Sequence, residues 1–177
     1  MKSSTKQIAL TGIGIALFVV FTLCLQVPIF ENYYVCLGYI VMAVYCCSVG
    51  VISGTIVGTV GVVLYCLLIS GLRGMPGWVV GNIIIGIVSG LAFRYTRLMP
   101  NKYLKYFLCS VAIVSSTFLG IFVMKSVVEM YLYSQPFLLR ASNNIFAFIA
   151  DVVVLLFAVP FCELLDLKIR KFIDGNK

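Results

Sequence analysis

Histidine is absent from the 177 residues, and only 6 residues are acidic. Without imidazole the chain lacks a common zinc ligand and the most common general acid–base group. The seven cysteines form no CxxC pair and lie mostly within apolar runs, which favours small buried side chains over metal ligands. We therefore expect neither a metal nor a cofactor.

Charged residues are scarce, at 11% of the chain, whereas hydrophobic residues make up 62%. This balance excludes an ordinary soluble domain and indicates that the solvent is a bilayer. A spanning helix needs about 20 apolar residues, so the length allows about six spans and no soluble catalytic domain. We predict an all-α membrane protein, with residues 1–177 forming a single six-helix transmembrane domain.

Turn and charge signals divide the chain into apolar segments. The predicted spans are about 8–27, 36–49, 51–70, 77–95, 104–131 and 141–166. The first follows Lys2 and Lys6 but shows no small-residue cleavage site, so we expect it to be retained as a helix. The second is short, and its boundary with the third is the least defined.

The basic residues predict the orientation. The net charge is +7, but the cations lie at the ends of apolar runs and do not form a nucleic-acid groove, so no nucleic acid is expected. Six spans place ten of them on one side: Lys2, Lys6, Arg94, Arg97, Lys102, Lys105, Lys168, Arg170, Lys171 and Lys177. The other side receives Arg73, Lys125 and Arg140. Both termini are therefore predicted to be cytoplasmic.

Polar residues of the last three spans are predicted to lie in the outer half of the membrane. Counting about 1.5 Å per residue from the cytoplasmic ends puts Asn82 near 18 Å, Asp151 near 22 Å and Trp78 near 24 Å. The same count places Lys125, Asn144 and Glu129 at roughly 30 to 36 Å. The inner half of these spans has few polar side chains, and this asymmetry suggests a function on the outer side.

Helical spacing brings several of these residues onto shared faces. Asn144 and Asp151 are seven residues apart on one face, and Lys125 and Glu129 are four apart on another. Ionisable groups in a membrane normally face a partner or a wet cavity. We therefore predict a polar pocket open to the outside, with Trp78 as a stacking wall. The loop QVPIFENYYVCLGY, which carries Tyr33, would lie above it.

Plainer interpretations exist for each residue. The pair Lys125 and Glu129 is also typical of an interfacial ion pair, and Trp78 of an aromatic-belt anchor. Asn82 and Asn144 are also typical of interhelical hydrogen bonds. We interpret Arg140 as marking the outer end of its helix. Asp151 is the hardest of these residues to explain without a function.

Small residues recur at four-residue spacing, as in Gly50, Gly54 and Gly58. The pairs Gly77–Gly81 and Gly86–Gly90 repeat the pattern, which lets helices approach closely. On the first span, Gly12 and Ala16 form a similar flat face.

With these features the chain resembles, over its whole length, an S component of an energy-coupling factor (ECF) transporter. The segment LGYIVMAVYCCSVGVISGTIVGTVGVVLY is similar to the glycine-rich second and third spans of the riboflavin-transporter-like S components. Tyr39 stands where family members commonly carry an acidic residue. The resemblance implies a vitamin-capturing subunit of an ABC-type importer, in the plasma membrane of a bacterium. It also implies that Gly12 and Ala16 dock onto a transmembrane coupling subunit, which two ATPase subunits drive.

The chain lacks a GxxxxGK[ST] motif, so ATP would be hydrolysed by those partners. Within the vitamin class implied by the resemblance, Trp78, Asn82 and the Asn/Asp face suit a small heteroaromatic ring with hydroxyls. Hydroxymethylpyrimidine or a vitamin B6 form is therefore favoured. Pantothenate is a rival, because Lys125 or Arg140 can pair with its carboxylate.

Two different classes of function also stay open. One is an intramembrane lipid-modifying enzyme, which is disfavoured by the lack of histidine and of a GxSxG elbow. The second is a structural subunit without a ligand, which is disfavoured by the gathering of polar residues in the outer half of the spans.

Overall fold

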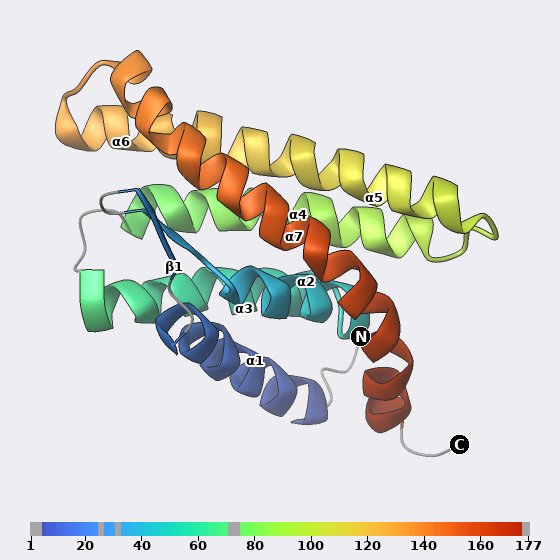
Figure 1. The fold of residues 1–177 in the computed structure, drawn as a ribbon. Coiled ribbons are helices and arrows are strands. Elements are labelled where there is room, and N and C mark those ends of the chain that lie inside the picture. Colours follow the sequence, from blue (N-terminus) through green and yellow to red (C-terminus); the bar gives the residue numbers. More distant parts are fainter. Residues whose placement is uncertain (1–4, 25–26, 31–32, 71–74, 175–177) are drawn as a thin grey trace.

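The computed structural model describes residues 5–24, 27–30, 33–70 and 75–174, and these residues form a bundle of helices (Figure 1). Its first part contains α1 (Thr5–Cys24), strands β1 (Val27–Phe30) and β2 (Tyr33–Val35), α2 (Gly38–Ser48), and α3 (Val51–Tyr65), which continues as the π-helix η1 (Cys66–Ser70). There follow α4 (Met75–Thr96), α5 (Lys102–Thr117), the π-helix η2 (Phe118–Lys125), α6 (Ser126–Tyr133) and α7 (Phe137–Asp174).

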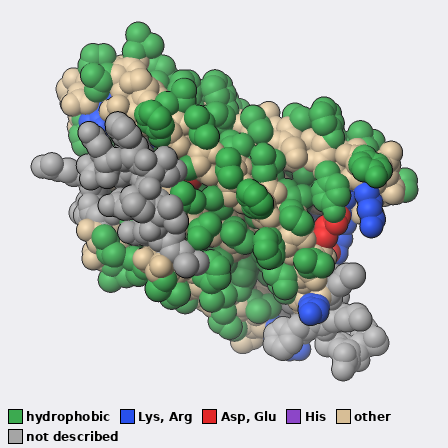
Figure 2. All heavy atoms as spheres, in the orientation of Figure 1, with side chains coloured by type: hydrophobic (Ala, Val, Ile, Leu, Met, Phe, Trp, Pro, Cys, Tyr) green, Lys and Arg blue, Asp and Glu red, His purple; other side chains and the backbone are tan. Residues whose placement is uncertain are grey.

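Within the described ranges, five helical segments are long and apolar enough to cross a membrane, and the shorter apolar helix α2 accompanies them. The consecutive elements α5, η2 and α6 form one of these segments, Lys102–Tyr133. Large apolar side chains face outward from the bundle, among them Ile52, Leu68, Phe107 and Phe157. Figure 2 shows hydrophobic side chains over most of the visible face. The predicted all-α membrane fold is confirmed.

The short second span has a structural explanation. The 11 residues of α2 cover only about 16 Å of a hydrocarbon layer about 30 Å thick. Strands β1 and β2 precede α2 and pair antiparallel, with Val27 opposite Val35, and β2 packs against α7. The sequence predicts a loop for this segment, and the hairpin corrects that prediction. Pairing satisfies backbone groups that lipid cannot satisfy.

Both ends of the described chain lie at one end of the bundle. Helix α1 begins there, α7 ends there, and α4 turns into α5 beside them (Figure 1). Figure 2 shows visible acidic side chains at this end, next to Lys and Arg side chains. The excess of Lys and Arg at this end is the basis of the prediction that it faces the cytoplasm, and we call it the cytoplasmic end.

Glycines permit close helix packing at several of the predicted positions. A Cβ added to Gly54 would lie 2.6 Å from the Cα of Cys46 in α2, and one added to Gly86 would lie 2.9 Å from the Cα of Thr55 in α3. Gly81 packs against the backbone of η2 in the same way. Gly50 differs, because it adopts a φ of 143° before α3 and no atom would meet its Cβ within 4 Å. The small-residue prediction is confirmed where helices cross.

We expect Gly54→Ala to destabilise the bundle by about 1–3 kcal/mol, because the added methyl group meets backbone atoms of α2. Gly12→Ala is the matched control, since nothing lies within 4 Å of its added Cβ. Thermal unfolding of both variants in detergent measures the difference. An equal midpoint in the two variants would contradict the packing.

Candidate substrate-binding site

The hydroxyl group of Tyr39 is the centre of a buried polar network that joins three helices. It donates a hydrogen bond to Oδ1 of Asn82 at 2.7 Å and accepts one from Nε1 of Trp78 at 2.8 Å. The amide group of Asn82 also donates to the carbonyl oxygen of Gly58 at 2.9 Å. Tyr39 and Asn82 are both 0% exposed. The network fixes α2, α3 and α4 around the indole of Trp78.

Asp151 connects α7 to this network. Its side chain is buried at 5% exposure, interacts with Tyr39, and lies within electrostatic range of Lys125. A buried carboxyl group requires such partners because desolvation disfavours its charged form. Asp151 therefore ties α7 to the Tyr39 network, with Lys125 at the end of η2 within electrostatic range. A second polar group begins at Lys125.

This second group joins the fifth and sixth spans. Nδ2 of Asn144 donates to Oε2 of Glu129 and to Oγ of Ser126, both at 3.0 Å. Lys125 and Glu129 form an ion pair with a 3.9 Å N···O distance. Ser126, Glu129 and Asn144 are all buried. The sequence spacing put Lys125 and Glu129 on one helix face and Asn144 and Asp151 on another, and the structure brings Glu129 and Asn144 into contact.

The π-helix η2 leads into this group. Its eight residues, Phe118–Lys125, interrupt the α-helical hydrogen-bond pattern before α6 begins, and such segments are frequent at functional sites. Gly120 lies against Gly81, and the aliphatic part of Lys125 lies against Gly77. Glycines on α4 thus allow the fifth span to approach closely beside the site.

The structure places six of the seven predicted binding residues in two buried polar groups: Trp78, Asn82 and Asp151 around Tyr39, and Lys125, Glu129 and Asn144 with Ser126. The seventh, Tyr33, begins β2, but its side chain lies outside the described part of the chain. Asn82 and Asn144 do hydrogen-bond between helices, as the plainer interpretation predicted. Trp78 donates its N–H inward to Tyr39, unlike a simple belt anchor. Their role in substrate binding remains a prediction.

Two residues of the network were missed as candidates. Tyr39 is not among the predicted binding residues, although an aromatic hydroxyl group in an apolar helix is itself a signal of a polar contact. Ser126 is also absent from the predicted binding residues.

Arg140 lies near the start of α7. Its guanidinium group stacks over the ring of Tyr133 at 4.5 Å, and its Nε is buried without a hydrogen-bond partner among the described residues.

Comparison with known families decides the class of protein. The family model described as the ECF-type riboflavin transporter S component matches residues 2–166. The chain belongs to this family. No curated protein and no solved structure matches it. It is a substrate-binding S component of a vitamin transporter, an integral membrane protein and not an enzyme.

The face of α1 that is predicted to contact a partner is exposed on the surface of the S component. Gly12 and Ala16 are exposed on α1, and an added Cβ at Gly12 would meet no atom within 4 Å. Gly14 and Phe18, on the opposite side of the same helix, are buried. Docking at this face remains a prediction.

The cytoplasmic end contains polar contacts that the sequence pattern does not predict. The pattern predicts few polar side chains in the inner half of the spans, whereas Glu163 of α7 pairs with Lys105 of α5, and Asp166 pairs with Arg97, which directly follows α4. Ser89 and Ser116 add a buried hydrogen bond at 3.1 Å between α4 and α5.

Proposed function

We propose that this S component captures a small heteroaromatic vitamin or vitamin precursor from the extracellular side. The observation that carries the proposal is the convergence of Trp78, Asn82 and Asp151 on the Tyr39 hydroxyl within the membrane. An indole ring offers a stacking surface, and the amide, hydroxyl and carboxyl groups offer both donors and acceptors. A planar ring with hydroxyl substituents matches this combination.

Hydroxymethylpyrimidine or a vitamin B6 form is the favoured substrate, because hydrogen-bonding groups gather beside an indole ring at the site. Riboflavin, which gives the family its description, is a larger heteroaromatic candidate. Pantothenate has no aromatic ring but carries a carboxylate. The buried Nε of Arg140 supports pantothenate, since a guanidinium group pairs well with a carboxylate.

Import requires partners in this proposal. A transmembrane coupling subunit docks on the Gly12 and Ala16 face, and two ATPase subunits supply the energy in the bacterial cell membrane. The exposed small side chains on α1 support close helix docking.

Trp78 provides the test, because it is the only tryptophan in the chain. We expect the purified protein to show a saturable change in Trp78 emission with hydroxymethylpyrimidine or a B6 form, and a weaker or no change with riboflavin and pantothenate. Trp78→Phe controls for absorption by the ligands. If neither hydroxymethylpyrimidine nor a B6 form changes the emission or raises the unfolding temperature, the proposed substrate is wrong.

A further inference from the structure

A cavity lies at the cytoplasmic end of the bundle, and none of the residues of the Tyr39 network lines it. Its volume is about 410 Å³. Apolar and thiol side chains line one part of it, namely Phe93, Cys109, Val159 and Cys162. Charged side chains line the rest, namely Arg97, Lys102, Lys105, Glu163 and Asp166. The cavity is therefore amphipathic, with three cations and two carboxylates.

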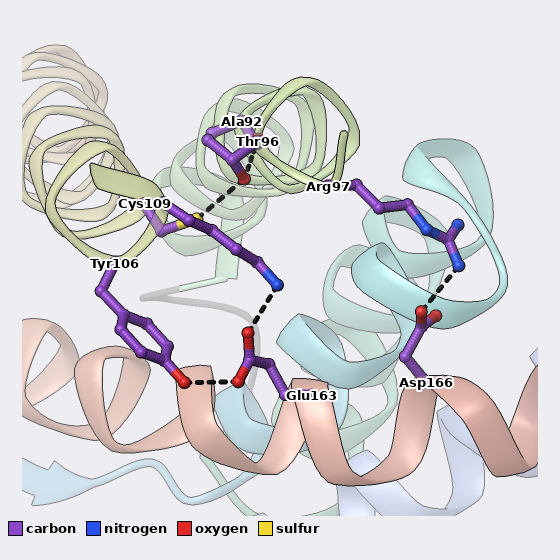
Figure 3. A network of polar contacts seen from close by, with 8 residues as sticks. Ala92, Thr96, Arg97, Tyr106, Cys109, Glu163 and Asp166 are labelled. Carbon is purple, nitrogen blue, oxygen red and sulfur yellow. Dashed lines mark hydrogen bonds and ion pairs between the residues drawn. The ribbon is translucent and has the colours of Figure 1, made fainter. Parts of the chain in front are cut away.

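Two ion pairs hold part of this lining in place. Nη2 of Arg97 lies 2.7 Å from Oδ2 of Asp166, and Nζ of Lys105 lies 2.6 Å from Oε1 of Glu163. The hydroxyl group of Tyr106 donates to the other oxygen of Glu163. Figure 3 shows Glu163 and Asp166 projecting from α7 toward the other two helices, with Tyr106 and Arg97 on opposite sides. The carboxylates thereby fix the positions of two cations.

The hydrogen-bonding groups of the lining that are not used in these contacts are mainly N–H donors of cationic side chains. A guanidinium group has five N–H donors and an ammonium group has three, and Arg97 and Lys105 each use one in these contacts. Both oxygens of Glu163 are already engaged. Lys102 lines the cavity and has no ion pair among the described residues. The lining thus has spare donors and few spare acceptors.

Two further features favour an anion. Helix α5 begins at Lys102, so its positive dipole end lies beside the cavity. The cavity also lies at the cytoplasmic end of the spans, where phosphates of anionic lipids are concentrated. Its apolar part suits the glycerol or acyl portion of such a lipid.

We infer that this cavity binds a phosphate group, carried by an anionic phospholipid or by a soluble phosphate ester, with Lys102, Arg97 and Lys105 as its donors. A basic pocket between membrane helices on the cytoplasmic side is suited to phosphate-bearing head groups. The site is separate from the outer network and does not depend on the vitamin that the outer network binds.

Native mass spectrometry of the full chain in mixed micelles tests this inference, with phosphatidylglycerol, phosphatidylcholine and glycerol 3-phosphate as probes. We expect tighter binding of phosphatidylglycerol than of phosphatidylcholine, and a loss of about fivefold in Lys102→Gln. Lys6→Gln is the matched control, because Lys6 is exposed at the same end and does not line the cavity. Lys102 has no ion pair to lose within the described part of the chain, so its replacement should leave the fold and vitamin binding intact.

The probes distinguish the two sources of phosphate. Binding of phosphatidylglycerol that depends on Lys102 identifies a lipid site, and Lys102-dependent binding of glycerol 3-phosphate alone identifies a soluble ester. The inference is overturned if the two lipids bind equally and glycerol 3-phosphate does not bind. It is also overturned if Lys102→Gln binds every probe as Lys6→Gln does.

Discussion

Asp151→Ala and Asn82→Ala are each expected to weaken vitamin binding by about tenfold or more, a loss of at least roughly 1.4 kcal/mol. Asp151 is the carboxyl group that links Tyr39 with Lys125, and Asn82 is 0% exposed while bonded to both α2 and α3. Removing either side chain leaves its buried polar partners without a hydrogen bond, and any direct contact of that side chain with the solute is lost as well. Equilibrium binding to the purified variants measures the effect.

Asn143→Ala is the matched control, because Asn143 is exposed on the same helix as Asp151, next to the buried Asn144. Asp151→Asn keeps the shape of the side chain and removes its charge. Because the packing is preserved, a loss of binding in this variant is due to the charge and not to unfolding. Unfolding temperatures without ligand identify any variant that is merely unstable. Wild-type affinity in folded Asp151→Ala and Asn82→Ala would refute the assignment of the site.

Gly12→Trp and Ala16→Trp are expected to abolish vitamin uptake by cells while leaving vitamin binding unchanged. A flat face of small residues lets a partner helix approach closely, and an indole ring on that face keeps the two backbones apart. Both residues are exposed, and no atom of the residues that the structure describes lies within 4 Å of an added Cβ at Gly12. The bulky side chain should therefore not disturb the bundle itself.

Val111→Trp provides the control for this second pair. Val111 is 47% exposed on α5, and α5 is not among the elements that pack extensively on α1. Uptake measured in cells, together with binding by the purified variants, separates docking from capture. Normal uptake in Gly12→Trp and Ala16→Trp would show that this face does not contact the coupling subunit.

Hydropathy predicted most of the fold because a span is defined by a long run of apolar residues, which is a local property. The predicted limits of 77–95 lie within α4, and 51–70 coincides with α3 and η1. The hairpin before α2 was not predicted, because strands β1 and β2 have only four and three residues. Such short strands form through pairing with each other and packing on α7 rather than through a periodic pattern.

The site was predictable where it depends on spacing within one helix. Lys125 and Glu129, four residues apart, form an ion pair in the structure. Asn144 and Asp151, seven residues apart on α7, both turn inward to polar partners. Tyr39 was not predicted, because its importance arises from which helices meet in space. The ion pairs of Glu163 and Asp166 were missed for the same reason, since their partners lie 58 and 69 residues away in the sequence.

Native mass spectrometry of the solute that copurifies with the wild-type protein and with Asp151→Ala tests the central claim most directly. That claim is that the polar residues around Tyr39 hold a nutrient within the outer half of the membrane. We predict one small heteroaromatic molecule bound to the wild-type chain and its loss from the folded Asp151→Ala variant. A solute retained at equal occupancy in both proteins would contradict the claim.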